Sequence, residues 1–150
     1  MRTLNVNIMH GAAIAALFLI VFISVVNAAE LTVTDGWIRA LPPNVPSGGY
    51  FTLHNGGKKS ISLTGASSPA CGMLMLHQTE NMGGMTQMND VANVNVPAGE
   101  TIKFSPGGYH LMCMSATSAI KPGKTVPVTL KFSDGSNVNA VFAVRDAAGK

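Results

Sequence analysis

Thr125-Val-Pro-Val-Thr-Leu-Lys-Phe132 is the stretch whose pattern most directly indicates the fold of this 150-residue chain. Every second residue is apolar, and the set Val126, Val128, Leu130 and Phe132 falls on one side of an extended strand. The segment Asn137–Val144 alternates in the same way after the turn Asp134-Gly-Ser136. Alternation of this kind buries one face of a sheet and leaves the other in solvent. We therefore predict two half-buried strands here.

Outward from these two strands, short runs rich in Val, Ile, Thr, Phe and Leu recur, and Gly, Pro, Asn and Asp separate them. The expected strands are Leu31–Arg39, Gly49–Asn55, Ser60–Gly65, Met73–Thr79, Ala92–Val96, Thr101–Ser105, Tyr109–Ser115, Thr125–Phe132 and Asn137–Val144. About seven to nine short strands in about 120 residues indicate an all-β Greek-key β-sandwich. We expect Trp37, the only tryptophan, to lie in its core.

The first 28 residues differ in composition from the rest. They carry one charged side chain, Arg2, followed by an apolar run from Ile14 to Val26. That run is short for a bilayer span, which needs about 20 apolar residues. A positive start, an apolar centre and small residues before a cut after Ala28 predict a signal peptide over 1–28 and one periplasmic domain over 29–150. Cutting after Ala29, or retention of the segment as a membrane anchor, is the alternative.

The charge of the remaining chain is low and scattered. Without residues 1–28 the net charge is near +2, and the basic residues form no dense run. Such a chain does not bind nucleic acid by electrostatic attraction. The sequence also has no paired carboxylates, no nucleophile–base arrangement and no phosphate-binding glycine loop. We therefore expect a monomeric, non-enzymatic protein with no membrane span once the signal peptide is removed.

Sulfur and imidazole side chains gather in about a third of this domain. All seven methionines outside residues 1–28 lie between positions 73 and 114, with Cys113 and two of the three remaining histidines, and Cys71 lies just before this range. In a strand, residues i and i+2 share a face, with their Cα atoms about 6.5 Å apart. Two predicted strands therefore each present a His/Met face, formed by Met73, Met75 and His77 in one and by His110, Met112 and Met114 in the other. If the two strands are neighbours, these faces converge on one ion.

The donor chemistry selects the metal. Thioethers are soft, uncharged ligands suited to Cu(I), and imidazole also binds copper well. Three further methionines, Met82, Met85 and Met88, lie in the polar stretch Glu80–Asp90, which we expect to be a loop rather than a core strand. Apolar side chains in such a loop indicate either a soft metal or a protein-binding surface.

The spacing of four residues adds a family resemblance. Ten residues separate His77 from Met88, 21 separate Met88 from His110, and one separates His110 from Met112. Together with Asp35-Gly-Trp-Ile-Arg39 and Pro106-Gly-Gly-Tyr-His-Leu-Met112, this pattern resembles the PCu(A)C family of periplasmic copper chaperones. The resemblance covers about Leu31 to Val144.

The resemblance implies a cupredoxin-like β-sandwich that binds copper, preferably Cu(I) and also Cu(II), through His77, Met88, His110 and Met112. It further implies delivery of that copper to the CuA site of cytochrome oxidase, alongside Sco-type proteins. A periplasmic copper-buffering protein without an oxidase target would use the same residues. An electron-transfer cupredoxin and a metal-free interaction module with a methionine-rich face are two further alternatives.

Five residues lie beside this motif without a settled role. Met75, Met85 and Met114 are auxiliary metal ligands or parts of a hydrophobic rim. If the strands that follow Cys71 and contain Cys113 are close, a disulfide between these cysteines would fix the ligand geometry. Two free buried thiols, or copper ligation by a cysteine, are the alternatives. Cys113 faces away from His110 in the expected strand, which disfavours the Cys–His site of an electron-transfer cupredoxin.

Overall fold

The computed structural model describes residues 31–150, and the predicted signal peptide lies outside these residues. The described chain is all-β, which confirms the predicted fold class. It contains ten strands: β1 (Leu31–Arg39), β2 (Ser47–Asn55), β3 (Ile61–Ser67), β4 (Cys71–Met82), β5 (Met85–Asp90), β6 (Val94–Val96), β7 (Thr101–Phe104), β8 (Tyr109–Ala116), β9 (Thr125–Phe132) and β10 (Asn137–Arg145). In this part of the chain no helix is long and apolar enough to cross a membrane.

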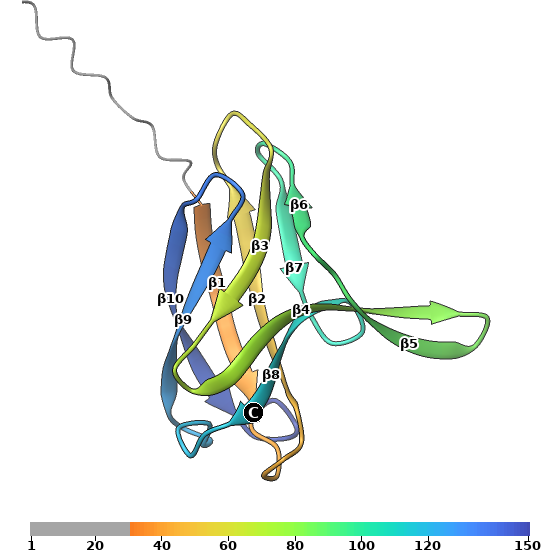
Figure 1. Ribbon diagram of the computed structural model, residues 1–150, viewed down its shortest axis with the longest axis vertical. Coiled ribbons are helices and arrows are strands. Elements are labelled where there is room, and N and C mark those ends of the chain that lie inside the picture. The colour runs from red at the N-terminus through yellow and green to blue at the C-terminus, as the bar shows by residue number, and fades with distance from the viewer. Residues whose placement is uncertain (1–30) are drawn as a thin grey trace, which may run out of the picture.

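The strands form one hydrogen-bonded path that folds back on itself around a shared core (Figure 1). Its order is β5-β4-β8-β2-β1-β10-β9-β3-β6, and β7 pairs with β2 beside this path. The edge of β2 is divided: Ser47–Gly49 pair with β8, and Phe51–His54 pair with β7. The turn between β7 and β8 therefore lies at the point where the partner of β2 changes from β7 to β8. This arrangement brings β8 into the middle of the sheet, next to β4.

The core follows the alternation of the last two strands. In β9 the residues on the predicted apolar face are buried, namely Val126, Val128, Leu130 and Phe132. In β10, Phe142 and Val144 are buried, while Val138 and Ala140 pack at the margin. Burial of each large aliphatic or aromatic side chain stabilises the fold by about 1.5–3 kcal/mol. The hydrophobic pattern thus fixes which side of these strands faces inward.

Two expectations from the sequence are wrong. The stretch Glu80–Asp90 is no simple loop, because β4 continues through it and turns back as β5. Nearly all of this hairpin is exposed, so β5 is defined by its backbone pairing with β4 and not by burial. Alternation of apolar and polar residues in the sequence therefore does not reveal β5. Trp37 is only half-buried, and its ring packs against that of Tyr50 with the centroids 4.6 Å apart and the ring planes inclined by 43°.

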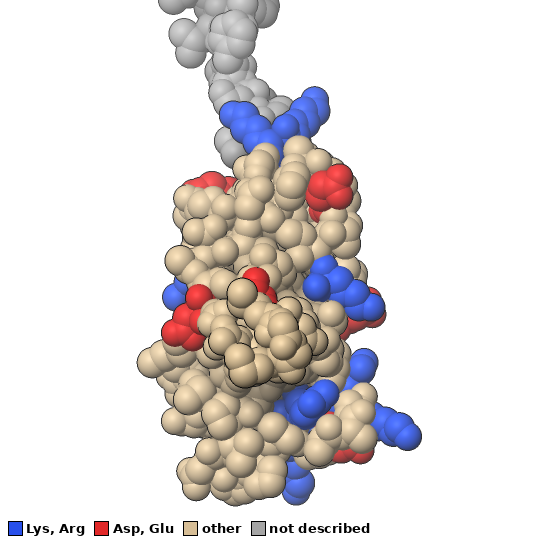
Figure 2. Space-filling view, turned by 90° about the vertical axis from the view of Figure 1, so that its right-hand side faces the viewer, with Lys and Arg blue, Asp and Glu red and all other residues tan. Residues whose placement is uncertain are grey.

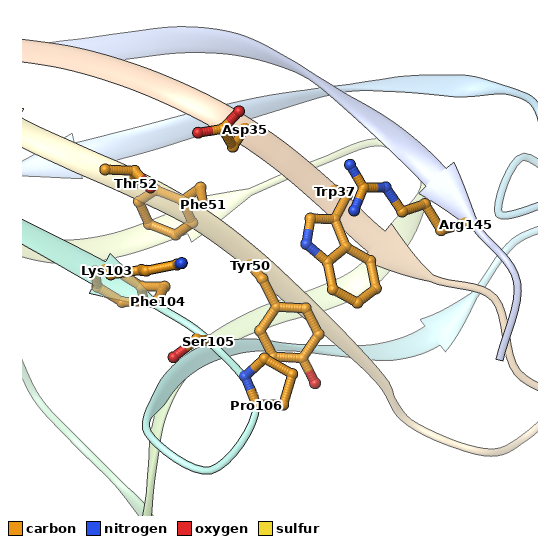
Figure 3. A pocket seen from close by; sticks show the side chains of 10 residues that line it. All are labelled: Asp35, Trp37, Tyr50, Phe51, Thr52, Lys103, Phe104, Ser105, Pro106 and Arg145. Carbon is orange, nitrogen blue, oxygen red and sulfur yellow. The ribbon is translucent and has the colours of Figure 1, made fainter. Parts of the chain in front are cut away.

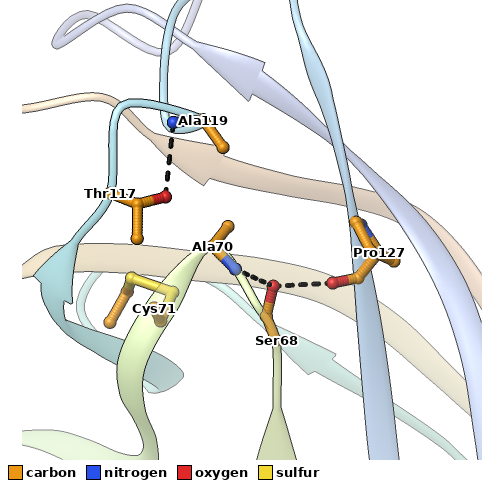
Figure 4. The surroundings of a disulfide bond; sticks show 7 residues. Ser68, Ala70, Cys71, Thr117, Ala119 and Pro127 are labelled. Atoms are coloured by element: carbon orange, nitrogen blue, oxygen red, sulfur yellow. Dashed lines mark hydrogen bonds between the residues drawn. A yellow bond between two sulfur atoms is a disulfide. The ribbon is translucent and has the colours of Figure 1, made fainter.

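A disulfide joins Cys71, the first residue of β4, to Cys113 in β8, with their Cα atoms 5.4 Å apart (Figure 4). Both residues are buried. The segment before Cys71 is fixed as well, since the Ser68 hydroxyl donates to Pro127 O at 2.7 Å and accepts from Ala70 N–H at 3.2 Å. The covalent bond therefore ties β4 to β8 on the core side of the sheet.

We predict that removing this disulfide destabilises the fold without abolishing it. A covalent link across 42 residues restricts the unfolded chain. Such links typically stabilise the native state by about 2–4 kcal/mol. Replacing both Cys71 and Cys113 by Ala should lower the free energy of unfolding by that amount, measured by guanidinium denaturation without reductant. Wild-type protein treated with reductant is the control and should match the variant. An unchanged unfolding midpoint would contradict the prediction.

Candidate metal site

The two predicted His/Met faces meet in the structure, because β4 and β8 are antiparallel neighbours. Their register places like donors opposite each other in three successive pairs on one face of the sheet. These pairs are Met73 with Met114, Met75 with Met112, and His77 with His110. We call these six residues the His/Met face. Side chains directly opposite each other in an antiparallel pair have Cβ atoms about 4.5–5.5 Å apart.

The reverse side of the same two strands is apolar. Its residues Leu74, Leu76, Leu111 and Cys113 are buried. The alternation predicted for both strands is therefore confirmed. Since the side-chain period of a strand is two, burial of these four residues obliges the His/Met face to point away from the core.

The two imidazole rings lie edge to face at the inner end of the His/Met face. The ring centroids of His77 and His110 are 5.7 Å apart and the ring planes are inclined by 66°. Metal–imidazole bonds are about 2 Å long, so rings at this separation can share one ion. The exposed fractions are 14% for the His77 side chain and 3% for His110. The pair is thus sheltered from solvent.

His110 is oriented for binding through one nitrogen. Its Nδ1–H donates to Gly108 O at 3.1 Å, which leaves Nε2 without a proton. Nε2 is buried and has no hydrogen-bond partner. Burial lowers the pKa of His110, the Gly108 hydrogen bond opposes that shift, and the nearby His77 lowers the pKa further. The ring is therefore held neutral, with a buried lone pair that faces no protein donor.

The turn Ser105–Gly108 supports this orientation. Gly108 O accepts a second hydrogen bond, from Thr79 N–H in β4 at 3.0 Å. Ser105 N–H donates to Tyr109 O at 3.0 Å, which closes the turn. Gly107 has a φ of +84°, a conformation that glycine adopts without steric strain. One carbonyl oxygen thus positions both the His110 ring and the neighbouring strand.

His77 has an acidic neighbour from the hairpin. Asp90 in β5 lies opposite His77, and Asp90 Oδ1 is 2.8 Å from His77 Nε2. The contact is not aligned as a hydrogen bond, and both ring nitrogens of His77 are buried without a hydrogen-bond partner. Asp90 is 73% exposed, so its carboxylate can turn into solvent and leave Nε2 free.

The β4–β5 hairpin distinguishes Met88 from the other two hairpin methionines. Met88 lies opposite Thr79, which shares a face with His77, so Met88 is a diagonal neighbour of His77. Diagonal neighbours are about 7–8 Å apart, within reach of a long side chain. Met82 and Met85 lie opposite each other on the other face of the hairpin. The register therefore places Met88 on the face of His77 and Met85 on the opposite face.

An aromatic group backs His110. The Tyr50 ring lies 6.3 Å from the His110 ring and contacts Trp37, over which the Arg145 guanidinium lies at 5.0 Å. Tyr50, Trp37 and Arg145 border a hollow of about 390 Å³ (Figure 3). A Cβ atom at Gly48 would collide with the Tyr50 hydroxyl, so a larger residue there would displace the Tyr50 ring. The lining contains no imidazole, thiol or thioether, so the hollow is not the metal site. Tyr50 is a supporting residue that the sequence pattern did not reveal.

The donors around the two imidazoles are soft. Within residues 31–150, no three His, Cys, Asp or Glu side chains gather into a metal-binding group. The sulfur of Cys113 is in the disulfide, so it supplies no thiolate for a blue-copper site. Two imidazoles bordered by Met75, Met112 and Met88 suit a soft monovalent cation better than calcium or magnesium, which bind clusters of oxygen ligands.

We predict that His110 in the metal-free protein is a neutral ring protonated on Nδ1. The hydrogen bond to Gly108 O requires this tautomer, and burial disfavours the charged ring. Long-range 1H–15N correlation spectra at neutral pH distinguish the two nitrogens. His54, which lies outside the site on β2, supplies the reference ring. A spectrum that shows Nε2–H for His110 would refute the assignment.

Comparisons with known proteins agree with this architecture. The family described as "Putative lipoprotein LpqE-like" matches residues 31–144. A relative from Leifsonia xyli, "Putative lipoprotein Lxx21020", is 31% identical over 124 residues, which are 82% of this chain and 74% of the relative. Among solved structures, Cu(I)-bound DR1885 from Deinococcus radiodurans is 32% identical, with a TM-score of 0.61, over 79% of this chain and 78% of that one.

A copper-bound PCuAC domain from PmoF2 has the same fold. Its TM-score is 0.65 at 19% identity, over 79% of this chain and 96% of that domain. At this identity the likeness concerns the fold alone. The family match, by contrast, spans nearly all of the described strands. We conclude that the chain belongs to the LpqE-like family of PCu(A)C domains.

Proposed function

We propose that this protein is an exported copper chaperone that carries one Cu(I) ion on His77, Met88, His110 and Met112. The observation that carries this proposal is the buried, unpaired Nε2 of His110, in a ring 5.7 Å from the His77 ring and bordered by thioethers. An orphaned buried acceptor is unfavourable in a folded protein unless a ligand uses it. A soft cation would satisfy this nitrogen.

The absence of charge on the proposed ligands favours binding that is weak enough for copper to be released. Two neutral imidazoles and two thioethers add no negative charge, so the electrostatic attraction to copper is modest. Neutral sulfur ligands favour Cu(I), while the two imidazoles alone also suit Cu(II). Met88 is 53% exposed and lies on a projecting hairpin, so an acceptor can replace this ligand first. Such a site suits a carrier rather than a permanent cofactor.

The comparisons support copper as the cargo. The DR1885 structure at 32% identity contains Cu(I), and the PmoF2 domain is described as copper-bound. Lipoprotein relatives support export, as does the predicted signal peptide over residues 1–28. From the resemblance to periplasmic chaperones, we propose that the CuA site of cytochrome oxidase receives this copper and that Sco-type proteins take part in the delivery.

The hairpin offers a matched test of the ligand set. Met88→Leu should weaken Cu(I) binding by about 10-fold or more, because it removes one sulfur and keeps the side-chain volume. Met85→Leu should leave binding unchanged, since Met85 is also exposed but lies on the opposite face of the hairpin. Competition with a chromophoric Cu(I) chelator measures both affinities. Equal weakening by both variants would argue against Met88 as a ligand.

The recipient is tested by direct transfer. Cu(I)-loaded protein mixed with an apo CuA domain and an oxidant should generate the purple absorption of the CuA centre. The His110→Ala variant, which removes the buried nitrogen, should not load and should transfer nothing. Stable one-to-one Cu(I) binding without transfer would favour a copper-buffering role instead.

A further inference from the structure

The His/Met face extends beyond the four proposed ligands. Met73, Met75 and Met114 continue the same ladder outward from the imidazole pair, and none of them belongs to the proposed set. Exposure falls steadily along this ladder, from 57% for Met73 and 38% for Met114 to 3% for His110. The outer end of the ladder is therefore open to solvent, and its inner end is the candidate site.

We propose that Met73, Met75 and Met114 form a second, outer Cu(I) site through which copper enters and leaves the inner site. The inference rests on the proposed function, since it assigns a route to the same ion. It explains why an exposed strand face carries thioethers, where a solvated sheet face ordinarily carries polar side chains.

The geometry allows three sulfurs to converge. Met73 lies directly opposite Met114, and Met75 is two residues along the same strand and face as Met73. Opposed Cβ atoms are about 4.5–5.5 Å apart and i, i+2 Cα atoms about 6.5 Å apart. The three rotatable bonds of methionine let its sulfur move toward a shared ion. Three thioethers without imidazole make a weaker and more exposed site than the inner one.

The outer and inner sites are adjacent. Met75 pairs directly with Met112, one of the proposed inner ligands. An ion can therefore pass by ligand exchange, in which a bond to the Met75 sulfur forms as a bond to an inner ligand breaks. Copper stays Cu(I) throughout, and neither a proton nor an electron is transferred.

The charge distribution leaves this route open to a cation. The sequence has no lysine or arginine from Ser60 to Ile102 or from Phe104 to Ile120, so β4, β5 and β8 carry no positive side chain. Figure 2 views the molecule from the side to which the hairpin projects. The end of the hairpin is free of charge, and the lysines and arginines lie on the body around it. A monovalent cation therefore meets little repulsion along the His/Met face.

The test compares two pairs of exposed methionines. The variant Met73→Leu with Met114→Leu removes the outer sulfurs and keeps apolar volume. The control Met82→Leu with Met85→Leu removes another exposed, directly opposed pair, on the other face of the hairpin. Each protein, with 13C-labelled methionine methyl groups, is titrated with Ag(I) as a redox-inert soft cation.

In wild type and control, the first equivalent should shift the Met88 and Met112 methyl signals, and the second should shift those of Met73, Met75 and Met114. In the outer variant the first equivalent should bind as in wild type, and affinity for the second should fall by about 10-fold or more. Second-equivalent binding that persists in the outer variant, or methyl signals at 73 and 114 that do not move, would overturn the proposal. Those results would make these methionines a hydrophobic rim. Failure of wild type to bind the first equivalent would instead refute the proposed function.

Discussion

The antiparallel pairing of β4 with β8, in the register that sets His77 opposite His110, is the constraint on which the candidate site depends. Because strand side chains alternate, a slip of one residue would bury methionine and expose leucine along the whole pair. The register is protected from the core side, where Leu76 and Leu111 are buried and the Cys71–Cys113 disulfide joins the strands. Packing on the core face of the two strands thus determines the positions of the His and Met side chains on the opposite face.

A buried neutral imidazole is the feature that this scaffold maintains at some energetic expense. His110 sits among apolar and aromatic neighbours, with one nitrogen held by Gly108 O and the other unpaired. Leaving such a group unsatisfied costs about 1–3 kcal/mol. The hydrogen bond to the turn before β8 and the neighbouring ring of Tyr50 restrict the imidazole, which lies 5.7 Å from the His77 ring. In the function proposed above, part of the folding stability is given up to pre-orient a nitrogen donor for a soft ion.

The hairpin shows where reasoning from the sequence failed. Alternation predicted the His/Met faces of two strands, because buried leucines mark the opposite face in each. The same rule could not detect β5, whose residues are exposed on both faces and are held by backbone hydrogen bonds to β4. Without that pairing, alternation does not distinguish Met88 from Met82 and Met85, and only the spacing shared with the PCu(A)C family selects it. The core prediction for Trp37 is wrong for a similar reason, since its contacts with Tyr50 and Arg145 involve residues distant in the sequence.

The sequence by itself determined the all-β class, the inward faces of β4, β8 and β9, and the gathering of His and Met residues in one region. These features follow from local periodicity and composition, which need no knowledge of neighbours. Only the tertiary structure decided that β4 lies beside β8, that Met88 joins the His77 face, and that His110 Nε2 is left unpaired. Each of these depends on which strands pair and in what register. Pairing is a long-range property that alternation within a single strand does not encode.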